Sequence, residues 1–186
     1  MFEIAREVSS HTTLSEVSRL PDRIGKVSEV NQLPDRLSSE NFKLTNEQRD
    51  TIQKETGWSE GITANIHSIS EYKVYQEANL KESVVGEKVS LIKSDIDWDK
   101  VDAMGRTNQE RTHLGLAPLD NNGRPMELHH IGQHSDSPLA ELTLEEHRGK
   151  GNDTILHNKT DKSEIDRQEF AKERQEYWKQ RTGQSL

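Results

Sequence analysis

The chain has 186 residues, enough for one domain of ordinary size with an extension and one modest core. Its composition is 30% hydrophobic and 31% charged, with a mean hydropathy of -0.98, so we expect some segment to be disordered or dependent on a partner. The net charge of -8 excludes binding to nucleic acid by bulk electrostatics alone, and the absence of cysteine excludes disulfides and thiolate metal sites.

The first 44 residues are rich in Ser, Asp, Arg and Val, and they contain the tetrapeptide LPDR twice, at residues 20–23 and 33–36. This pattern is typical of a linker with Pro-Asp turns or of short docking helices, although the repeat could also be a chance duplication. No apolar run reaches membrane-spanning length, and the segment MFEIAREVSS lacks the apolar core of a signal peptide. We therefore predict a linker or partly disordered extension over residues 1–44, with export, if any, directed by another segment or chain.

Helix-start signals recur from Thr45 onward. In each, a hydroxyl residue precedes an acid or amide by three positions, the spacing at which the two side chains satisfy unpaired N–H groups of a first helical turn. The pairs are Thr45/Gln48, Thr107/Glu110, Thr143/Glu146 and Ser163/Asp166, and they predict helices over residues 46–56, 108–114, 144–149 and 164–181.

Two hairpin-like patterns lie between these helices. Residues 88–96 partly alternate and are predicted to pair with residues 83–85 across Gly86. After the turn sequence DNNG at residues 120–123, residues 125–131 (PMELHHI) predict a strand and residues 139–143 (LAELT) its partner. The order from Asp120 onward is therefore turn, strand, loop, strand, helix, preceded by a supporting region of helices and strands over residues 45–104.

The last predicted helix carries Arg167, Arg174 and Arg181, which recur every seven residues and so fall on nearly one face. One interpretation is a solvated face whose arginines pair with the interspersed glutamates. The other is a strip that contacts phosphate, which would give an acidic protein the local positive charge that binding nucleic acid requires.

Histidines are concentrated in one part of the chain, because six of the eight lie between residues 113 and 157. Successive side chains of a strand point to opposite faces, so His129 and His130 cannot easily bind one ion in the same way. One ring can hold a metal while its neighbour keeps a nitrogen that takes a proton from water. His147, at the start of the following helix, and His157 are the further candidate ligands, and the alternative is that all are ordinary surface or capping histidines.

The sequence Glu127-Leu128-His129-His130, followed by a strand and a helix that carries another histidine, resembles the ββα-metal finger of the HNH and endonuclease VII superfamily. More narrowly it resembles the branch named for its Leu-His-His motif, and the resemblance covers about residues 105–181. It implies an α+β fold with a ββα-metal nuclease core, surrounded by helices, over residues 105–186.

The resemblance also implies roles for individual residues. The first histidine of the pair, His129, corresponds to a metal ligand and the second, His130, to the general base. His147 corresponds to the helix histidine. Colicin-type nucleases place their last ligand one helical turn later, where this chain has Gly151.

The third ligand is therefore expected to be His157, with His134 as the alternative. Arg124 and Glu127 resemble the arginine and glutamate that precede the paired histidines in colicin-type sites and brace the strand. Together with His130 they form the expected catalytic group.

Members of this branch are commonly the C-terminal nuclease modules of bacterial polymorphic toxins. The resemblance thus implies a DNA endonuclease with one divalent ion (Zn²⁺, Ni²⁺, Mn²⁺ or Mg²⁺), secreted or delivered by contact into the cytoplasm of a target cell and neutralised by an immunity protein. Two alternatives remain at this point: a zinc-stabilised module that binds nucleic acid or protein without catalysis, and an RNase on the same scaffold.

Overall fold

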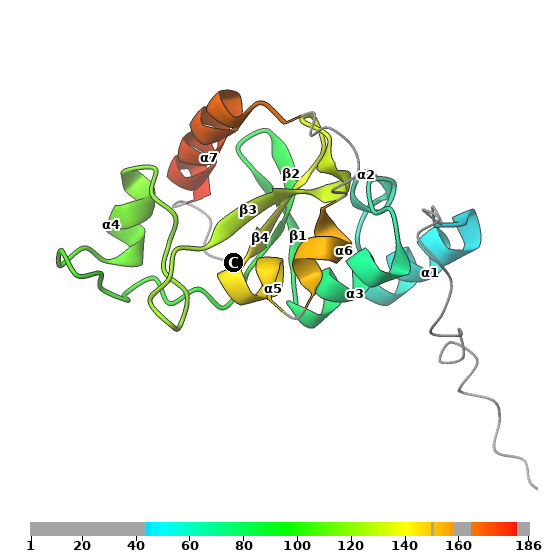
Figure 1. Cartoon of the computed structure of the whole chain (residues 1–186), viewed down its shortest axis with the longest axis horizontal. Helices are drawn as coiled ribbons and strands as arrows, with labels where there is room; N and C mark the ends of the chain where they lie inside the picture. Colours follow the sequence, from blue (N-terminus) through cyan, green and yellow to red (C-terminus); the bar gives the residue numbers. More distant parts are fainter. Residues whose placement is uncertain (1–43, 150, 158–164, 182–186) are drawn as a thin grey trace, which may run out of the picture. The chain divides into compact units, whose positions relative to one another are not determined.

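The structure is a computed structural model that describes residues 44–149, 151–157 and 165–181. The elements in chain order are α1 (Asn46–Thr56), α2 (Glu60–Thr63), α3 (Ile69–Glu77), β1 (Lys81–Val85), β2 (Lys88–Ile92), α4 (Asn108–His113), β3 (Glu127–His130), the short 3₁₀ turn η1 (Ile131–Gln133), β4 (Leu139–Leu142), α5 (Leu144–Arg148), α6 (Asn152–Leu156) and α7 (Arg167–Arg181) (Figure 1). This combination of one small sheet with helices confirms the predicted α+β class. The expected N-terminal extension lies outside the described residues.

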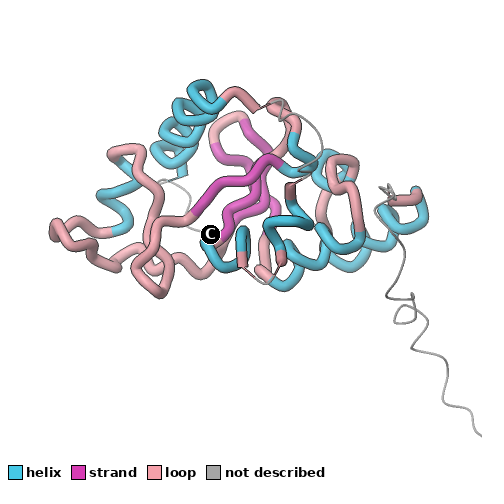
Figure 2. Tube along the Cα trace, in the orientation of Figure 1, coloured by secondary structure: helices cyan, strands magenta, loops and turns pink. Residues whose placement is uncertain are grey.

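A four-stranded sheet in the order β1-β2-β4-β3 forms the centre of this unit (Figure 2). β1 and β2 form the predicted antiparallel hairpin, and β3 and β4 form the second one. The two hairpins join through a parallel pairing of β2 with β4, in which Ser90 lies beside Leu139 and Leu91 beside Ala140. β3 is consequently an edge strand: among the described residues, only β4 pairs with it.

Three of the four predicted helix starts are reciprocal capping boxes. The hydroxyls of Thr45, Thr107 and Thr143 accept from the third backbone N–H of α1, α4 and α5, and the side chain at that third position accepts from the threonine N–H in return. Each box satisfies two backbone donors that a helix start otherwise leaves unpaired. The fourth pair includes Ser163, which lies outside the described residues.

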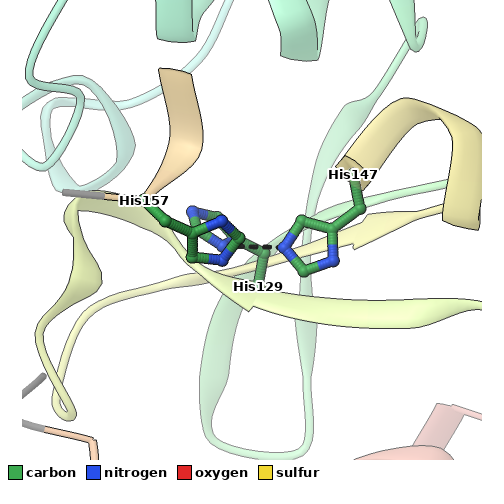
Figure 3. A group of neighbouring side chains, drawn as sticks. All are labelled: His129, His147 and His157. Atoms are coloured by element: carbon green, nitrogen blue, oxygen red, sulfur yellow. Dashed lines mark hydrogen bonds between the residues drawn. The ribbon is translucent and has the colours of Figure 1, made fainter. Parts of the chain in front are cut away.

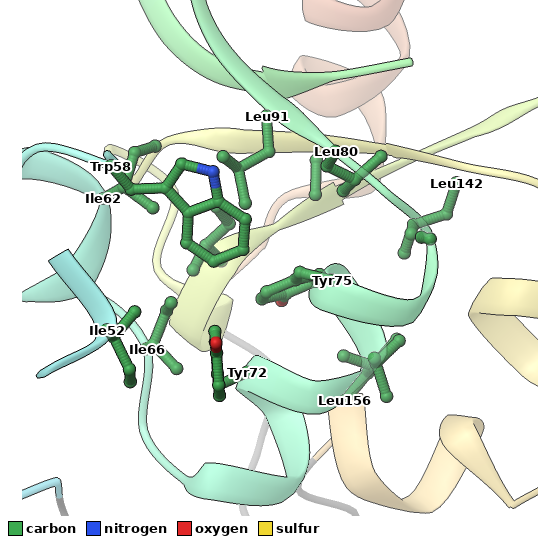
Figure 4. Close-up of a cluster of buried hydrophobic side chains, with 14 of the residues drawn as sticks. Ile52, Trp58, Ile62, Ile66, Tyr72, Tyr75, Leu80, Leu91, Leu142 and Leu156 are labelled. Atoms are coloured by element: carbon green, nitrogen blue, oxygen red, sulfur yellow. The ribbon is translucent and has the colours of Figure 1, made fainter. Parts of the chain in front are cut away.

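A separate apolar cluster packs against each face of the sheet. On one face α1, α2, α3 and α6 pack against β2 and β4, with Ile62, Tyr75 and Leu91 fully buried (Figure 4). On the other face Tyr177 and Trp178 of α7 pack against residues that include Leu128 and Leu139. Alternation along β3 and β4 therefore sends successive side chains into two different environments.

Residues 45–104 and 105–181 are not separately packed. β2 belongs to the first range and β4 to the second, yet they are hydrogen-bonded neighbours, and both apolar clusters draw residues from both ranges. The region before residue 105 therefore supplies two of the four strands of the sheet that carries β3. Within the described part of the chain, no helix has the length and apolarity needed to cross a membrane.

Candidate metal centre and catalytic histidine

Three imidazoles from three different elements converge on one face of the sheet. His129 lies on β3, His147 on α5, and His157 directly follows α6, and one ligand atom from each lies within 4.8 Å of the others (Figure 3). The Nε2 atom of His147 lies 3.2 Å from Nδ1 of His129. Of the two predicted choices for the third ligand, the structure brings His157 into the group. His134 packs its ring against that of His67 instead, with centroids 5.8 Å apart.

The end of α5 and the turn that follows it explain how His157 reaches this group. α5 ends at Arg148, and Gly151 then adopts a φ of +84°, a left-handed conformation that glycine adopts without steric cost. The short helix α6 follows and ends directly before His157. Gly151 is the position one helical turn after His147, where a continued helix would present a ligand. In this chain it is instead the turn residue between α5 and α6.

Glu127 orients His147 through the ring nitrogen that faces away from the other two imidazoles. Its Oε2 lies 2.7 Å from Nδ1 of His147 and accepts a 2.8 Å hydrogen bond from Nε of Arg148. With its Nδ1 proton directed to the carboxylate, His147 presents the lone pair of Nε2 to the other two rings. In the same way Nδ1 of His157 lies 3.0 Å from the Asp153 carbonyl oxygen, which leaves its Nε2 available. Glu127 thus supports a metal ligand rather than touching a reacting atom.

Burial favours the neutral forms of His129 and His147. It lowers the pKa of His129 well below the ordinary value, and the neighbouring His147 and His157 lower it further. Burial also lowers the pKa of His147, although the hydrogen bond to Glu127 opposes this effect. Burial acts to raise the pKa of Glu127, but the hydrogen bonds from Arg148 and His147 outweigh it and hold that pKa below its ordinary value. Neutral imidazoles beside a carboxylate anion are the protonation states that metal binding requires.

These residues fit a divalent cation. The Nε2 atom of His129 is buried and has no hydrogen-bond partner, a costly arrangement unless a cation or water satisfies the cluster. Among the described residues, this is the one group of His, Asp and Glu side chains with the spacing of a metal site. Three imidazoles suit Zn²⁺, Ni²⁺ or Mn²⁺ and leave further coordination positions open, as a catalytic rather than a structural site requires.

His130 lies on the other face of β3, as alternation predicted. Its ring packs against Phe170 of α7 with centroids 4.5 Å apart, and its Nε2 lies 2.9 Å from Oε2 of Glu173. The turn after His130 is fixed, because Gly132 N–H donates to the buried Glu71 carboxylate. Gly132 has a positive φ, and a Cβ there would collide with the backbone oxygen of Asn65, so this turn needs glycine. The adjacent imidazoles therefore have different surroundings, one among ligands and one beside a carboxylate.

The three arginines of α7 do not form one strip. Arg167 and Arg174 are exposed, and Arg174 lies over the Phe170 ring at 5.0 Å. Arg181 is only 2% exposed: its Nε donates to Glu141 at 2.8 Å and its guanidinium lies over Trp98. The prediction that Arg181 contacts phosphate is therefore wrong, because its charge is used inside the core.

Arg124 forms an ion pair with Asp120, with Nε 3.5 Å from Oδ2, and no described contact links it to the imidazoles. It lines a groove of about 470 Å³ together with Glu127, Arg174 and Trp178. The structure therefore places Arg124 in this groove and outside the group of imidazoles.

Sequence reasoning missed two residues that the structure places at the site. Arg148 directly follows a ligand and bonds Glu127, while its side chain remains 58% exposed. Glu173 contacts His130 from α7. The signal for Arg148 was its adjacency to His147; the signal for Glu173 was its position three residues after Phe170, on the inward side of the helix.

Comparison with known families gives one match, over residues 107–184, to the LHH family, whose model is described as a nuclease of the HNH/ENDO VII superfamily with conserved LHH. The matched segment contains His129, His130, His147 and His157. No match was found among curated proteins, and none among solved structures.

Proposed function

Because residues 107–184 belong to the LHH branch of the HNH/endonuclease VII nuclease superfamily, we propose that this chain is a metal-dependent endonuclease that hydrolyses phosphodiester bonds in DNA. The observation that carries the proposal is the convergence of His129, His147 and His157, with the adjacent His130 outside that group. A structural metal site has no use for the fourth imidazole, whereas hydrolysis needs a base that no cation occupies.

The metal ligands and the general base lie on opposite faces of β3. His129, His147 and His157 would hold the divalent ion, which when bound supplies Lewis-acid stabilisation of negative charge on the phosphate and the departing oxygen. His130 takes the proton from the attacking water. Because β3 is an edge strand, a phosphate placed along its open edge is reachable from side chains on both faces.

Positive charge near the site is local, in keeping with the net charge of -8. Arg148 lies next to a ligand, keeps an exposed side chain and uses its Nε on Glu127, so the rest of its guanidinium can face a phosphate. Arg124 and Arg174 line the groove between β3 and α7. We infer that the DNA backbone follows this groove toward Arg148, with the exposed Arg167 further along α7.

A plasmid-nicking assay tests the proposal. His130→Ala should abolish nicking yet keep Zn²⁺ binding and the unfolding midpoint, while EDTA should abolish nicking by the wild type. His113→Ala is the matched control, since His113 is exposed at the end of α4. Nicking by His130→Ala at the wild-type rate would refute the assignment of the base.

We further infer that the nuclease is the toxic module of a bacterial polymorphic toxin, delivered into the cytoplasm of a target cell and neutralised by a cognate immunity protein. The support is the sequence resemblance to a branch whose members commonly have that role. Induced expression should stop bacterial growth and fragment the chromosome, and co-expression of a small neighbouring reading frame should restore growth. Growth arrest that persists in His130→Ala would argue against DNA cleavage as the cause.

A zinc-stabilised binding module is the second candidate, favoured by the burial of His130, which is 3% exposed. It predicts that DNA or protein binding survives in His130→Ala and that wild-type protein does not cleave plasmid in any divalent ion. An RNase on the same scaffold would cleave tRNA and leave plasmid intact when both are offered together.

A further inference from the structure

The carboxylate of Glu173 on α7 contacts His130, the candidate general base on β3. Glu173 Oε2 lies 2.9 Å from Nε2 of His130, and its other oxygen, Oε1, lies 2.9 Å from Nζ of Lys88 on β2. Lys88 thus holds the carboxylate from the opposite side. The side chain of His130 is 3% exposed and that of Glu173 is 30% exposed, so the pair lies at the inner margin of the helix–sheet contact.

Phe170 fixes the plane of the same ring. It lies one helical turn before Glu173, and its ring centroid is 4.5 Å from that of His130 with the planes inclined by 50°. The Nε2 atom of His130 is buried and makes no well-aligned hydrogen bond, although the carboxylate of Glu173 lies at ion-pair distance from it. Catalytic hydrogen bonds are often misaligned in a free enzyme and tighten when substrate binds.

We propose, on the basis of the nuclease function proposed above, that Glu173 is the positioning residue of the general base. Its carboxylate holds the imidazole proton on Nε2, so that Nδ1 of His130 is the nitrogen with the free lone pair. A water proton passes to Nδ1 as the water oxygen bonds to phosphorus and the bond to the 3′ oxygen breaks, with its electron pair staying on that oxygen. The imidazolium formed is then stabilised by the adjacent carboxylate.

Charge at Glu173 supports this role. Burial acts to raise its pKa, but the contacts with His130 and Lys88 prevail and hold the pKa below the ordinary value. The residue is therefore an anion when His130 acts, as a partner for a cationic ring must be. A purely structural ion pair between α7 and the sheet would use the same anion, so the two roles differ only in what they do to the chemical step.

The test compares three single substitutions in the full chain. Glu173→Gln removes the charge at the base, Lys88→Met removes the other half of the same helix–sheet contact, and Glu176→Gln changes an exposed glutamate on the same helix. We expect kcat for plasmid nicking to fall about 10- to 100-fold in Glu173→Gln, with KM and Zn²⁺ affinity within twofold of wild type. Glu176→Gln should stay within about threefold, Lys88→Met should lose less kcat than Glu173→Gln because the carboxylate itself remains, and Glu173→Asp should recover part of the loss.

A spectroscopic measurement reads the tautomer directly. Long-range ¹⁵N–¹H spectra of the histidine rings in the Zn²⁺-loaded protein should place the His130 proton on Nε2 in wild type and show a tautomer mixture in Glu173→Gln. An unchanged Nε2 proton in the variant overturns the proposal even if nicking cannot be measured.

The outcomes also separate this proposal from the one it rests on. If His130→Ala is inactive while Glu173→Gln keeps a kcat within twofold of wild type, the positioning role is wrong and the nuclease proposal stands. If Lys88→Met loses as much kcat as Glu173→Gln, the contact is only structural. If His130→Ala itself nicks plasmid normally, the proposed base is wrong and the role of Glu173 falls with it.

Discussion

Replacing Arg181 distinguishes a buried structural charge from a phosphate contact. Arg181 donates to Glu141 Oε1 and to the Lys93 carbonyl oxygen, each at 2.8 Å, and the two paired side chains are 2% and 0% exposed. Tyr177 donates a second hydrogen bond to the same Glu141 oxygen. Arg181→Ala leaves a buried carboxylate without its counter-charge, and losing one partner of a buried pair costs about 3–5 kcal/mol in the free energy of unfolding.

That loss converts to a melting temperature lower by roughly 6–20 °C for a chain of this size. Thermal and urea unfolding followed by circular dichroism measure it, with Arg174→Ala as the exposed control on the same helix face, expected to shift the free energy of unfolding by less than about 1 kcal/mol. DNA affinity, measured below the melting temperature, should fall in Arg174→Ala and not in Arg181→Ala. The opposite pattern, with Arg181→Ala as stable as wild type but weak in DNA binding, would refute the buried network.

Three further predictions concern the metal group, the substrate and acid stability. His157→Ala should weaken Zn²⁺ binding by more than about tenfold in calorimetric titration whereas His134→Ala should leave it within twofold, since losing even a supporting residue of a metal ligand costs about 10- to 100-fold. Arg148→Ala should raise KM for DNA more than it lowers kcat and reduce the slope of log affinity against log salt by about 1, as expected for one lost phosphate contact. Hydrogen bonding, first from Arg106, lowers the pKa of Asp102, so stability from this pair is complete above the usual aspartate pKa and is lost as pH falls below it. Asp102→Asn should therefore lower the urea midpoint at pH 7, and the difference between the midpoints of the wild type and the variant should shrink progressively as the pH falls below the usual aspartate pKa.

Local chemistry made much of this fold predictable. Capping boxes at Thr45, Thr107 and Thr143 each act within four residues, so their signals survive without knowledge of the tertiary structure. Both hairpins follow from alternation and turn residues for the same reason. The spacing of Ser68 and Glu71 carries the same helix-start signal for α3, but Glu71 points inward, where it accepts from the backbone N–H groups of His67 and Gly132.

The parallel pairing of β2 with β4 had no such local signal. It joins residues 90 and 139, and a parallel pair needs a long connection whose sequence does not say which strands will meet. Without that pairing, residues 45–104 look separable from the nuclease segment. The short helix α6 was equally hard to foresee, because it has five residues and makes no side-chain hydrogen bond at its N-cap.

At the site, residue type indicated which histidines come together, whereas periodicity did not indicate which arginines of α7 stay exposed. Imidazole is chemically specific, so clustered histidines indicate a shared function whatever the elements between them. A seven-residue spacing says only that Arg167, Arg174 and Arg181 share a side of a helix, not whether that side is covered along its whole length. Arg181 follows Tyr177 and Trp178 by four and three residues and therefore lies over the same buried surface, where only a charged partner such as Glu141 makes a guanidinium tolerable. The neighbouring apolar residues, rather than the arginine repeat, decide which charges of α7 remain available to a phosphate.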